Sequence, residues 1–271
     1  MDVFWRLVPT LCLIVALHTS VLGATSSHCR RAESASFVVV SDSSLHDAQQ
    51  TAELCEAWRA RLQDQWCQKR DAAWTPKCEV VIHASRGGYV GAVGYGSAQT
   101  YASSLINRER GSHMTVRRID ICGDGQLGIA ALPHELTHLV LADLFGGRQA
   151  PRWADEGLAV LADPRDKQVL HQRDLASCLA RGTEFRLGEL LLIESYPHPS
   201  RVPAFYGQSD SLAAFLIGRD EPTKFIEFLR RAMEQGYDRA LKETYSIENV
   251  TQLERQWRAW CVASMHGKSG G

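Results

Sequence analysis

The chain has 271 residues, of which 45% are apolar and 23% are charged, and its formal net charge at pH 7 is −1. This length and balance suit one or two globular units with a core large enough to fold without a partner. The near-neutral charge gives no electrostatic reason to expect nucleic acid or an anionic surface as a partner, so we expect neither.

Residues 1–24 have the pattern of a secretory signal. Arg6 gives a positive start, Leu7–Leu17 an apolar core, and small residues allow cleavage after Gly23 or Ala24. The apolar run is too short for a membrane anchor, and no other segment approaches about 18 apolar residues. We therefore expect an exported chain, secreted or periplasmic, with no membrane span.

Cysteine usage fits an exported protein. Of the eight cysteines, Cys12 leaves with the signal, so an odd number remains and at least one thiol stays free or pairs between chains. No C-x-x-C spacing occurs, which argues against a cysteine zinc site or a redox motif. Cys67 and Cys78 flank a short connection, and we expect them to form the first disulfide.

The N-terminal half alternates strand and helix patterns. The predicted strands are Phe37–Val40, Cys78–His83, Tyr101–Asn107 and Thr115–Cys122, and the predicted helix is Asp47–Gln68. Glycines between Gly87 and Gly96 resemble a phosphate-binding loop. No Lys-Ser/Thr pair follows them and no Rossmann unit frames them, so they predict a flexible surface loop instead.

The sequence HELTH lies within an apolar, helix-forming run, residues 130–141. Positions i and i+4 share one face of a helix, so His134 and His138 can direct two imidazoles at one metal ion. Glu135 lies about 100° around the helix from His134, near enough to reach a water on that metal.

A second helix is predicted from Trp153 to just before Pro164, after a helix stop at Gly146-Gly147. It carries Glu156, 18 residues after His138, an interval that lets the chain turn and return a carboxylate to the histidine pair. Two His and one Glu with an open fourth position form a catalytic zinc set. The alternative is that Glu156 is an acid favoured by the helix dipole.

The remaining chain reads as helices and completes an α+β pattern, with a mixed sheet and helix first and a mostly helical C-terminal half. The predicted helices are Lys167–Arg181, Leu187–Glu194, Ala204–Gly218, Glu221–Gly236, Tyr237–Tyr245 and Val250–Ala263. Asn249 and Gln252 would cap the last of these, and Trp257 and Trp260 would lie in the core. We expect a single domain, 25–265, with a sheet-containing half, 36–124, a helical half, 126–263, and a disordered tail, 266–271.

HELTH followed by PRWADEGLA resembles the gluzincin zinc metallopeptidases, especially the peptidase MA-like branch with its W-x-x-E-G-x-A segment. The similarity is specific over Leu132–Ala162 and extends more weakly to about residue 263. The resemblance implies a zincin-like fold in which His134, His138 and Glu156 bind Zn²⁺. It also implies that Glu135 is the general base and acid.

The chain departs from family patterns at two points. The G-x-M-E-N segment, with which aminopeptidase-type gluzincins anchor a free amino terminus, has no counterpart here. Thermolysin-like members place an Asp four residues after the ligand Glu to orient a ligand His, where this chain has Val160. Asp155 or Asp163 would then supply that orienting carboxylate.

A Y-x-Q-S segment at Tyr206 continues the resemblance, since gluzincins use a Tyr or His from the helical half to stabilise the oxyanion. Tyr206 is the first candidate and His198 the second. The alternative is that Tyr206 is an ordinary core or surface tyrosine. His83, His113 and His171 show no partner pattern and are interpreted as incidental.

These observations predict an exported zinc metallopeptidase that cleaves peptide or protein substrates. The missing amino-terminus anchor favours an endopeptidase. Two other functions stay open: a non-catalytic zincin-like binding module at the cell surface, and a zinc-dependent amidase or esterase. The intact Glu135 argues against the binding module, because a purely structural zinc site does not need that carboxylate.

Overall fold

A computed structural model of the protein describes residues 30–67, 70–108, 114–146 and 148–267. The predicted signal, 1–24, lies outside these residues, as do the last four residues of the predicted tail. The chain divides into two compact units, Met1–Ala60 with Asp71–Leu139 and Arg61–Arg70 with Val140–Gly271. Within the described residues, no helix is long and apolar enough to span a bilayer.

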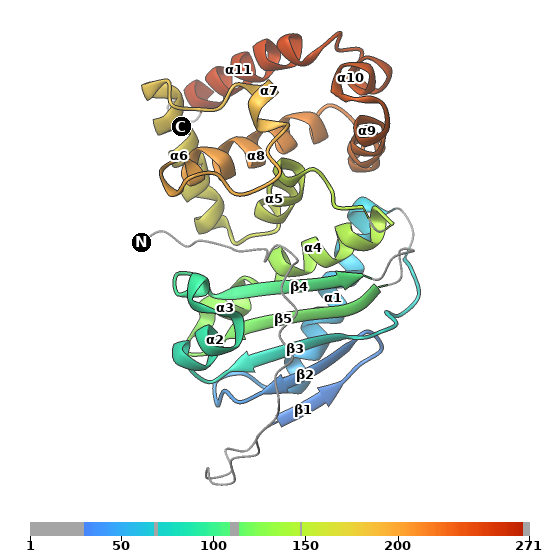
Figure 1. Ribbon diagram of the computed structural model, residues 1–271, viewed down its shortest axis with the longest axis vertical. Coiled ribbons are helices and arrows are strands. Elements are labelled where there is room, and N and C mark those ends of the chain that lie inside the picture. Colours follow the sequence, from blue (N-terminus) through green and yellow to red (C-terminus); the bar gives the residue numbers. More distant parts are fainter. Residues whose placement is uncertain (1–29, 68–69, 109–113, 147, 268–271) are drawn as a thin grey trace. The chain divides into compact units, whose positions relative to one another are not determined.

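The described part of the first unit contains a five-stranded mixed sheet in the order β1-β2-β3-β5-β4 (Figure 1). Its strands are β1 Arg30–Glu33, β2 Phe37–Ser41, β3 Cys78–His83, β4 Ala102–Arg108 and β5 Met114–Cys122. The central strands β2, β3 and β5 are parallel, whereas β1 and β4 pair antiparallel at the two edges. Parallel neighbours need a crossover, and α1, Ala48–Trp66, provides the one between β2 and β3.

Helix α1 forms where the sequence places a cap and an apolar stripe. The Asp47 carboxylate accepts hydrogen bonds from the backbone N–H groups of Gln49 and Gln50 at 2.9 and 3.1 Å, which satisfies donors of the first turn. Cys55 and Leu62 are buried on its inner side, and the helix runs along one face of the sheet (Figure 1). The burial of this stripe stabilises both the helix and the sheet face.

The glycine-rich segment is not a loop, so that prediction was wrong. It forms helix α2, Arg86–Val93, followed by a short 3₁₀ helix, Tyr95–Ser97. The Ser85 hydroxyl accepts a hydrogen bond from the Gly88 N–H, and the buried Tyr89 hydroxyl lies 2.6 Å from the Thr100 hydroxyl. The cap and this anchored aromatic side chain outweigh the low helix propensity of glycine.

The second unit is helical, and α8 is its central element. Helix α8 contacts α5, α6, α9 and α11. The helices beyond the HELTH helix are α5 Arg152–Leu161, α6 Arg165–Arg181, α7 Leu187–Leu190, α8 Val202–Ile217, α9 Pro222–Gln235, α10 Tyr237–Tyr245 and α11 Val250–Gly267. Gln208 on α8 is buried, and its amide exchanges two hydrogen bonds with the backbone of Phe185, at 2.6 and 2.9 Å.

The α+β class predicted from the sequence is confirmed. The cap of α11 is confirmed as well, because the Gln252 N–H donates to the Asn249 side chain at 2.9 Å. Trp257 is buried as expected, whereas Trp260 is 38% exposed, so its placement in the core was wrong. Trp260 is three residues beyond Trp257 on α11 and lies at the margin of the apolar stripe, where it covers Phe215 at a centroid distance of 5.7 Å.

The expected Cys67–Cys78 disulfide is not formed, and the structure joins no two of the described cysteines. Cys78 starts β3 and is fully buried. Burial raises the pKa of its thiol, and the neighbouring Cys55 on α1 raises it further. The Cys78 side chain therefore faces the core beneath α1, whereas Cys67 follows the end of that helix in a half-buried position.

Gly157 on α5 allows the backbone of α8 to approach closely. A Cβ atom at Gly157 would lie 2.5 Å from the Ser209 carbonyl oxygen and 3.1 Å from the Ala213 Cβ. Gly157→Ala should therefore lower the free energy of unfolding by about 1–3 kcal/mol, since the helices must separate. Urea or guanidinium unfolding measures this.

Gly188→Ala is the matched control for Gly157→Ala. Gly188 lies in α7 of the same unit, and a Cβ atom there would meet nothing within 4 Å. Alanine should raise the free energy of unfolding by up to about 1 kcal/mol, because it restricts the unfolded chain. If both variants change stability equally, close packing at Gly157 is not what positions α5.

Candidate metal centre

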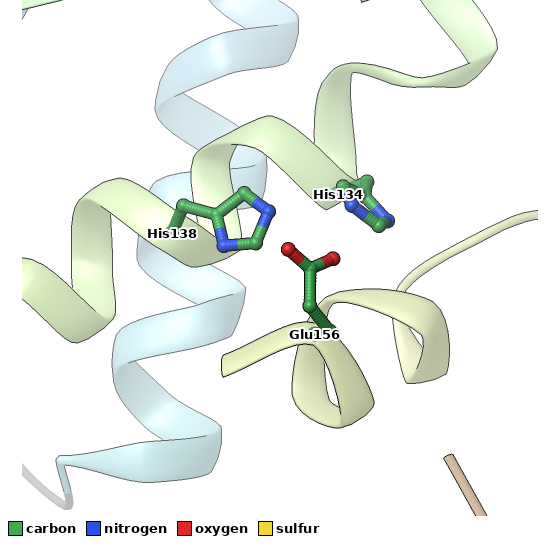
Figure 2. Close-up of side chains that lie close together, drawn as sticks. All are labelled: His134, His138 and Glu156. Carbon is green, nitrogen blue, oxygen red and sulfur yellow. The ribbon is translucent and has the colours of Figure 1, made fainter. Parts of the chain in front are cut away.

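The HELTH segment forms helix α4, Leu132–Leu144. Pro133 occupies its first turn, where a missing N–H costs nothing, and the Thr137 hydroxyl donates to the Pro133 carbonyl oxygen at 2.8 Å. His134 and His138 lie one turn apart on the same face, with ring centroids 4.9 Å apart and planes at 77° (Figure 2). The helix therefore presents two imidazoles side by side, as the spacing predicts.

Helix α5 carries Glu156, and all its residues from Arg152 to Val160 are buried. Trp153 anchors it through a hydrogen bond from its indole N–H to the Tyr237 hydroxyl at 2.9 Å. That hydroxyl in turn donates to the Leu191 carbonyl oxygen at 3.1 Å. Burial raises the pKa of Tyr237 to about 12, so the hydroxyl keeps the proton that it donates to Leu191 even in alkaline solution.

His134, His138 and Glu156 come together as a buried group (Figure 2). One ligand atom from each lies within 4.8 Å of the others. Two ligands of a tetrahedral zinc ion lie about 3.4 Å apart, given zinc–ligand bonds of about 2.0–2.2 Å. The group is therefore wider than a filled zinc site by at most about 1.4 Å, which side-chain torsions can close. Its donors suit a transition metal, so this group could hold a metal ion.

Glu135 follows His134 on α4 and does not belong to the ligand group. Its side chain is only 2% exposed. Burial raises the pKa of the Tyr89 hydroxyl, and the negative charge of Glu135 raises it further. The role of Glu135 as the general base stays a prediction.

The two candidates for oxyanion stabilisation have different surroundings. Tyr206 on α8 is 2% exposed, and its ring stacks on His171 at a centroid distance of 5.4 Å. His198 is exposed and caps the 3₁₀ helix Pro199–Arg201, with Nδ1 2.9 Å from the Ser200 hydroxyl. Both roles stay predictions.

The role of Asp155 or Asp163 as the orienting carboxylate stays a prediction. The Asp163 side chain pairs with the Lys167 ammonium at 2.8 Å, and Asp155 is buried in the first turn of α5. A contact to the candidate ligand Glu156 comes from Tyr196, whose hydroxyl donates to Glu156 Oε1. Sequence reasoning missed Tyr196, which lies in a loop 40 residues from its partner and belongs to no periodic pattern or motif.

Two of the other histidines considered from the sequence, His83 and His171, have partners in the structure. His83 Nε2 lies 2.7 Å from Asp120 Oδ1 on the neighbouring strand. Burial alone would raise the Asp120 pKa, but hydrogen bonds from His83 and Arg118 outweigh it and lower that pKa. Asp120 is therefore ionised at neutral pH. His171 stacks on Tyr206, and His113 lies outside the described residues.

No protein-family profile matches the chain, and no curated protein is similar to it. The class of protein is therefore described from its fold and its candidate site alone. It is an α+β protein with a buried His-His-Glu group that could hold a metal ion.

Proposed function

We propose that this protein is a zinc-dependent metallopeptidase that hydrolyses peptide bonds in peptide or protein substrates. The buried group of His134, His138 and Glu156 carries this proposal, because its two imidazoles and one carboxylate are the ligand set of catalytic zinc sites. The resemblance of residues 132–162 to gluzincins supports the same ligands and the same class.

Zinc bound by these residues would lower the pKa of a water molecule to about 7 and polarise a substrate carbonyl. Glu135 accepts the proton of the attacking water and then delivers it to the leaving amine. The burial of Glu135 matters for this task, because a site that excludes bulk water prevents loss of the transferred proton to solvent. Tyr206 donates a hydrogen bond to the oxyanion.

The setting proposed for this activity is outside the cytoplasm, in the periplasm or the extracellular medium. This rests on the signal pattern of residues 1–24, which lie outside the described residues. The absence of a G-x-M-E-N segment supports internal cleavage of the substrate over removal of its first residue. Intact mass of the exported protein tests the location, since the mature chain should begin near Ala24 or Thr25.

Cleavage of a peptide library by zinc-loaded protein tests the function. Hydrolysis should stop when a chelator removes the metal and return when zinc is added back. A parallel set of ester and non-peptide amide substrates tests the alternative function as a zinc-dependent amidase or esterase. Cleavage of these substrates without cleavage of any peptide would favour that alternative. Zinc binding without hydrolysis of any substrate would favour the binding module.

Tyr206→Phe tests the proposed oxyanion donor. The variant loses one hydroxyl that acts mainly in the transition state, so kcat should fall about 10²–10³-fold with little change in KM. Steady-state kinetics on a cleaved library peptide measure both constants. If kcat is unchanged, Tyr206 is structural, and the role passes to His198, to be tested as His198→Asn.

A further inference from the structure

Tyr196 is held in place from several sides within the second unit. It lies in the loop between α7 and the 3₁₀ helix Pro199–Arg201. Its ring meets Phe205 edge to face at a centroid distance of 6.2 Å and Tyr206 in a tilted pair at 6.4 Å. Both partners lie on α8 and are buried. Aromatic pairs at these distances restrict the ring to few orientations.

Arg152 ties the same loop to α5. Its guanidinium carbon lies 4.9 Å from the centroid of the Tyr196 ring, a cation–π contact. Its Nε also donates to the Glu194 carbonyl oxygen at 2.8 Å. Arg152 is buried at the start of α5, one helical turn before Glu156, so one side chain of the ligand-bearing helix fixes both the ring and the backbone of the loop.

The result of this packing is that the Tyr196 hydroxyl donates a hydrogen bond to Glu156 Oε1. We propose that Tyr196 is the positioning residue of the candidate ligand Glu156. Its hydroxyl holds Oε1, so that the carboxylate would bind a metal ion through Oε2 alone. Arg152 supports this role by fixing the tyrosine ring.

The chemistry of carboxylate ligands explains why such a partner matters. A carboxylate can bind a metal through one oxygen or through both, and two-oxygen binding would fill the position that a catalytic zinc site keeps open for water. A hydrogen bond to one oxygen favours binding through the other. In the thermolysin-like peptidases that the motif resembles, a carboxylate orients a ligand histidine, whereas here a hydroxyl would orient the candidate ligand glutamate.

This inference rests on the metal-binding part of the proposed function and is independent of hydrolysis. Tyr196→Phe removes the hydroxyl and keeps the ring with its aromatic and cation–π contacts. Because partners of metal ligands typically contribute 10–100-fold to affinity, we expect the zinc dissociation constant to rise about 10–100-fold. Competition with a chromophoric chelator, using purified full-length protein and zinc alone, measures it.

Tyr245→Phe is the matched control. Tyr245 is also a buried tyrosine of the second unit, at the end of α10, and its ring packs on Phe228 of α9 at a centroid distance of 5.5 Å. This variant should keep the zinc affinity of the parent. Equal zinc affinities for Tyr196→Phe and the parent would overturn the inference, as would an equal loss of affinity in Tyr245→Phe.

Cobalt substitution gives a second readout that a general loss of stability does not produce. Four-coordinate Co²⁺ absorbs visible light more strongly than five-coordinate Co²⁺. If Glu156 in Tyr196→Phe binds through both oxygens, the visible absorption per bound Co²⁺ should fall, and an unchanged spectrum would contradict one-oxygen positioning. If Tyr196→Phe folds poorly, Arg152→Met is the second variant to test. It keeps the aliphatic length of the side chain but removes the charge that fixes the tyrosine ring, so its visible absorption per bound Co²⁺ should also fall.

The outcome for zinc binding can differ from the outcome for hydrolysis. If the parent binds zinc without hydrolysing peptides, and Tyr196→Phe binds zinc more weakly, the proposed function is refuted and this inference is supported.

Discussion

Replacing Glu135 by glutamine should reduce peptide hydrolysis about 10²–10⁴-fold, the typical contribution of general base catalysis, while the protein stays folded and keeps its metal. A neutral amide can still hydrogen-bond the attacking water, but it cannot accept the proton. Glu135 is outside the ligand group, so the zinc content should stay at about one ion per chain. Steady-state kinetics with elemental analysis of the same preparations measure both quantities.

Asp143→Asn provides the control for Glu135→Gln. Asp143 lies on the same helix, α4, and the replacement also converts a carboxylate to an amide. The control variant should retain both hydrolysis and zinc. Glu135→Gln with the full activity of the parent would show that the metallopeptidase mechanism is wrong, even if the metal site is real.

The parts of the fold predicted correctly are those with strong local signals. The strand Cys78–His83 and the helix Tyr237–Tyr245 have the same bounds in the sequence prediction and in the structure, because apolar periodicity and flanking turn residues determine them locally. The segment from Gly87 to Gly96 was misread because its helix depends on the Ser85 cap and on the buried contact of Tyr89. Composition alone reports neither of these interactions.

In the candidate site, too, the sequence predicts what local spacing determines and misses what depends on contacts between distant segments. Helical spacing alone places His134 beside His138, and the short helix–loop–helix interval is consistent with the return of Glu156. The contact of Tyr196 with Glu156 is different, since it depends on how a loop packs against α5 and α8 through Arg152 and Phe205. Such packing leaves no repeat in the sequence, so only the three-dimensional arrangement reveals it.

Replacing His138 by alanine should abolish zinc binding. Removing one of three protein ligands leaves an incomplete site, and the zinc content should fall from about one ion per chain to less than about 0.1. A metal that binds only the folded chain also stabilises it, by about 2.7 kcal/mol when free zinc is 100 times the dissociation constant. For a chain of this size that corresponds to a Tm increase of roughly 5–10 °C, which zinc should give to the parent and not to His138→Ala.

His46→Ala is the control for His138→Ala, because it also removes a buried histidine. It separates the loss of zinc-dependent stabilisation from the general cost of losing such a side chain. His46 is buried in the first unit, with Nε2 2.9 Å from the Gly125 carbonyl oxygen, and it is not part of the ligand group. Its loss should lower the Tm of the metal-free protein by a few degrees, because the Gly125 carbonyl loses a hydrogen-bond partner. Zinc should nevertheless still bind this variant and raise its Tm by the same amount as in the parent. If zinc stabilises His138→Ala as strongly as it stabilises His46→Ala, the ion binds elsewhere on the chain, and the assignment of His134, His138 and Glu156 as its ligands is wrong.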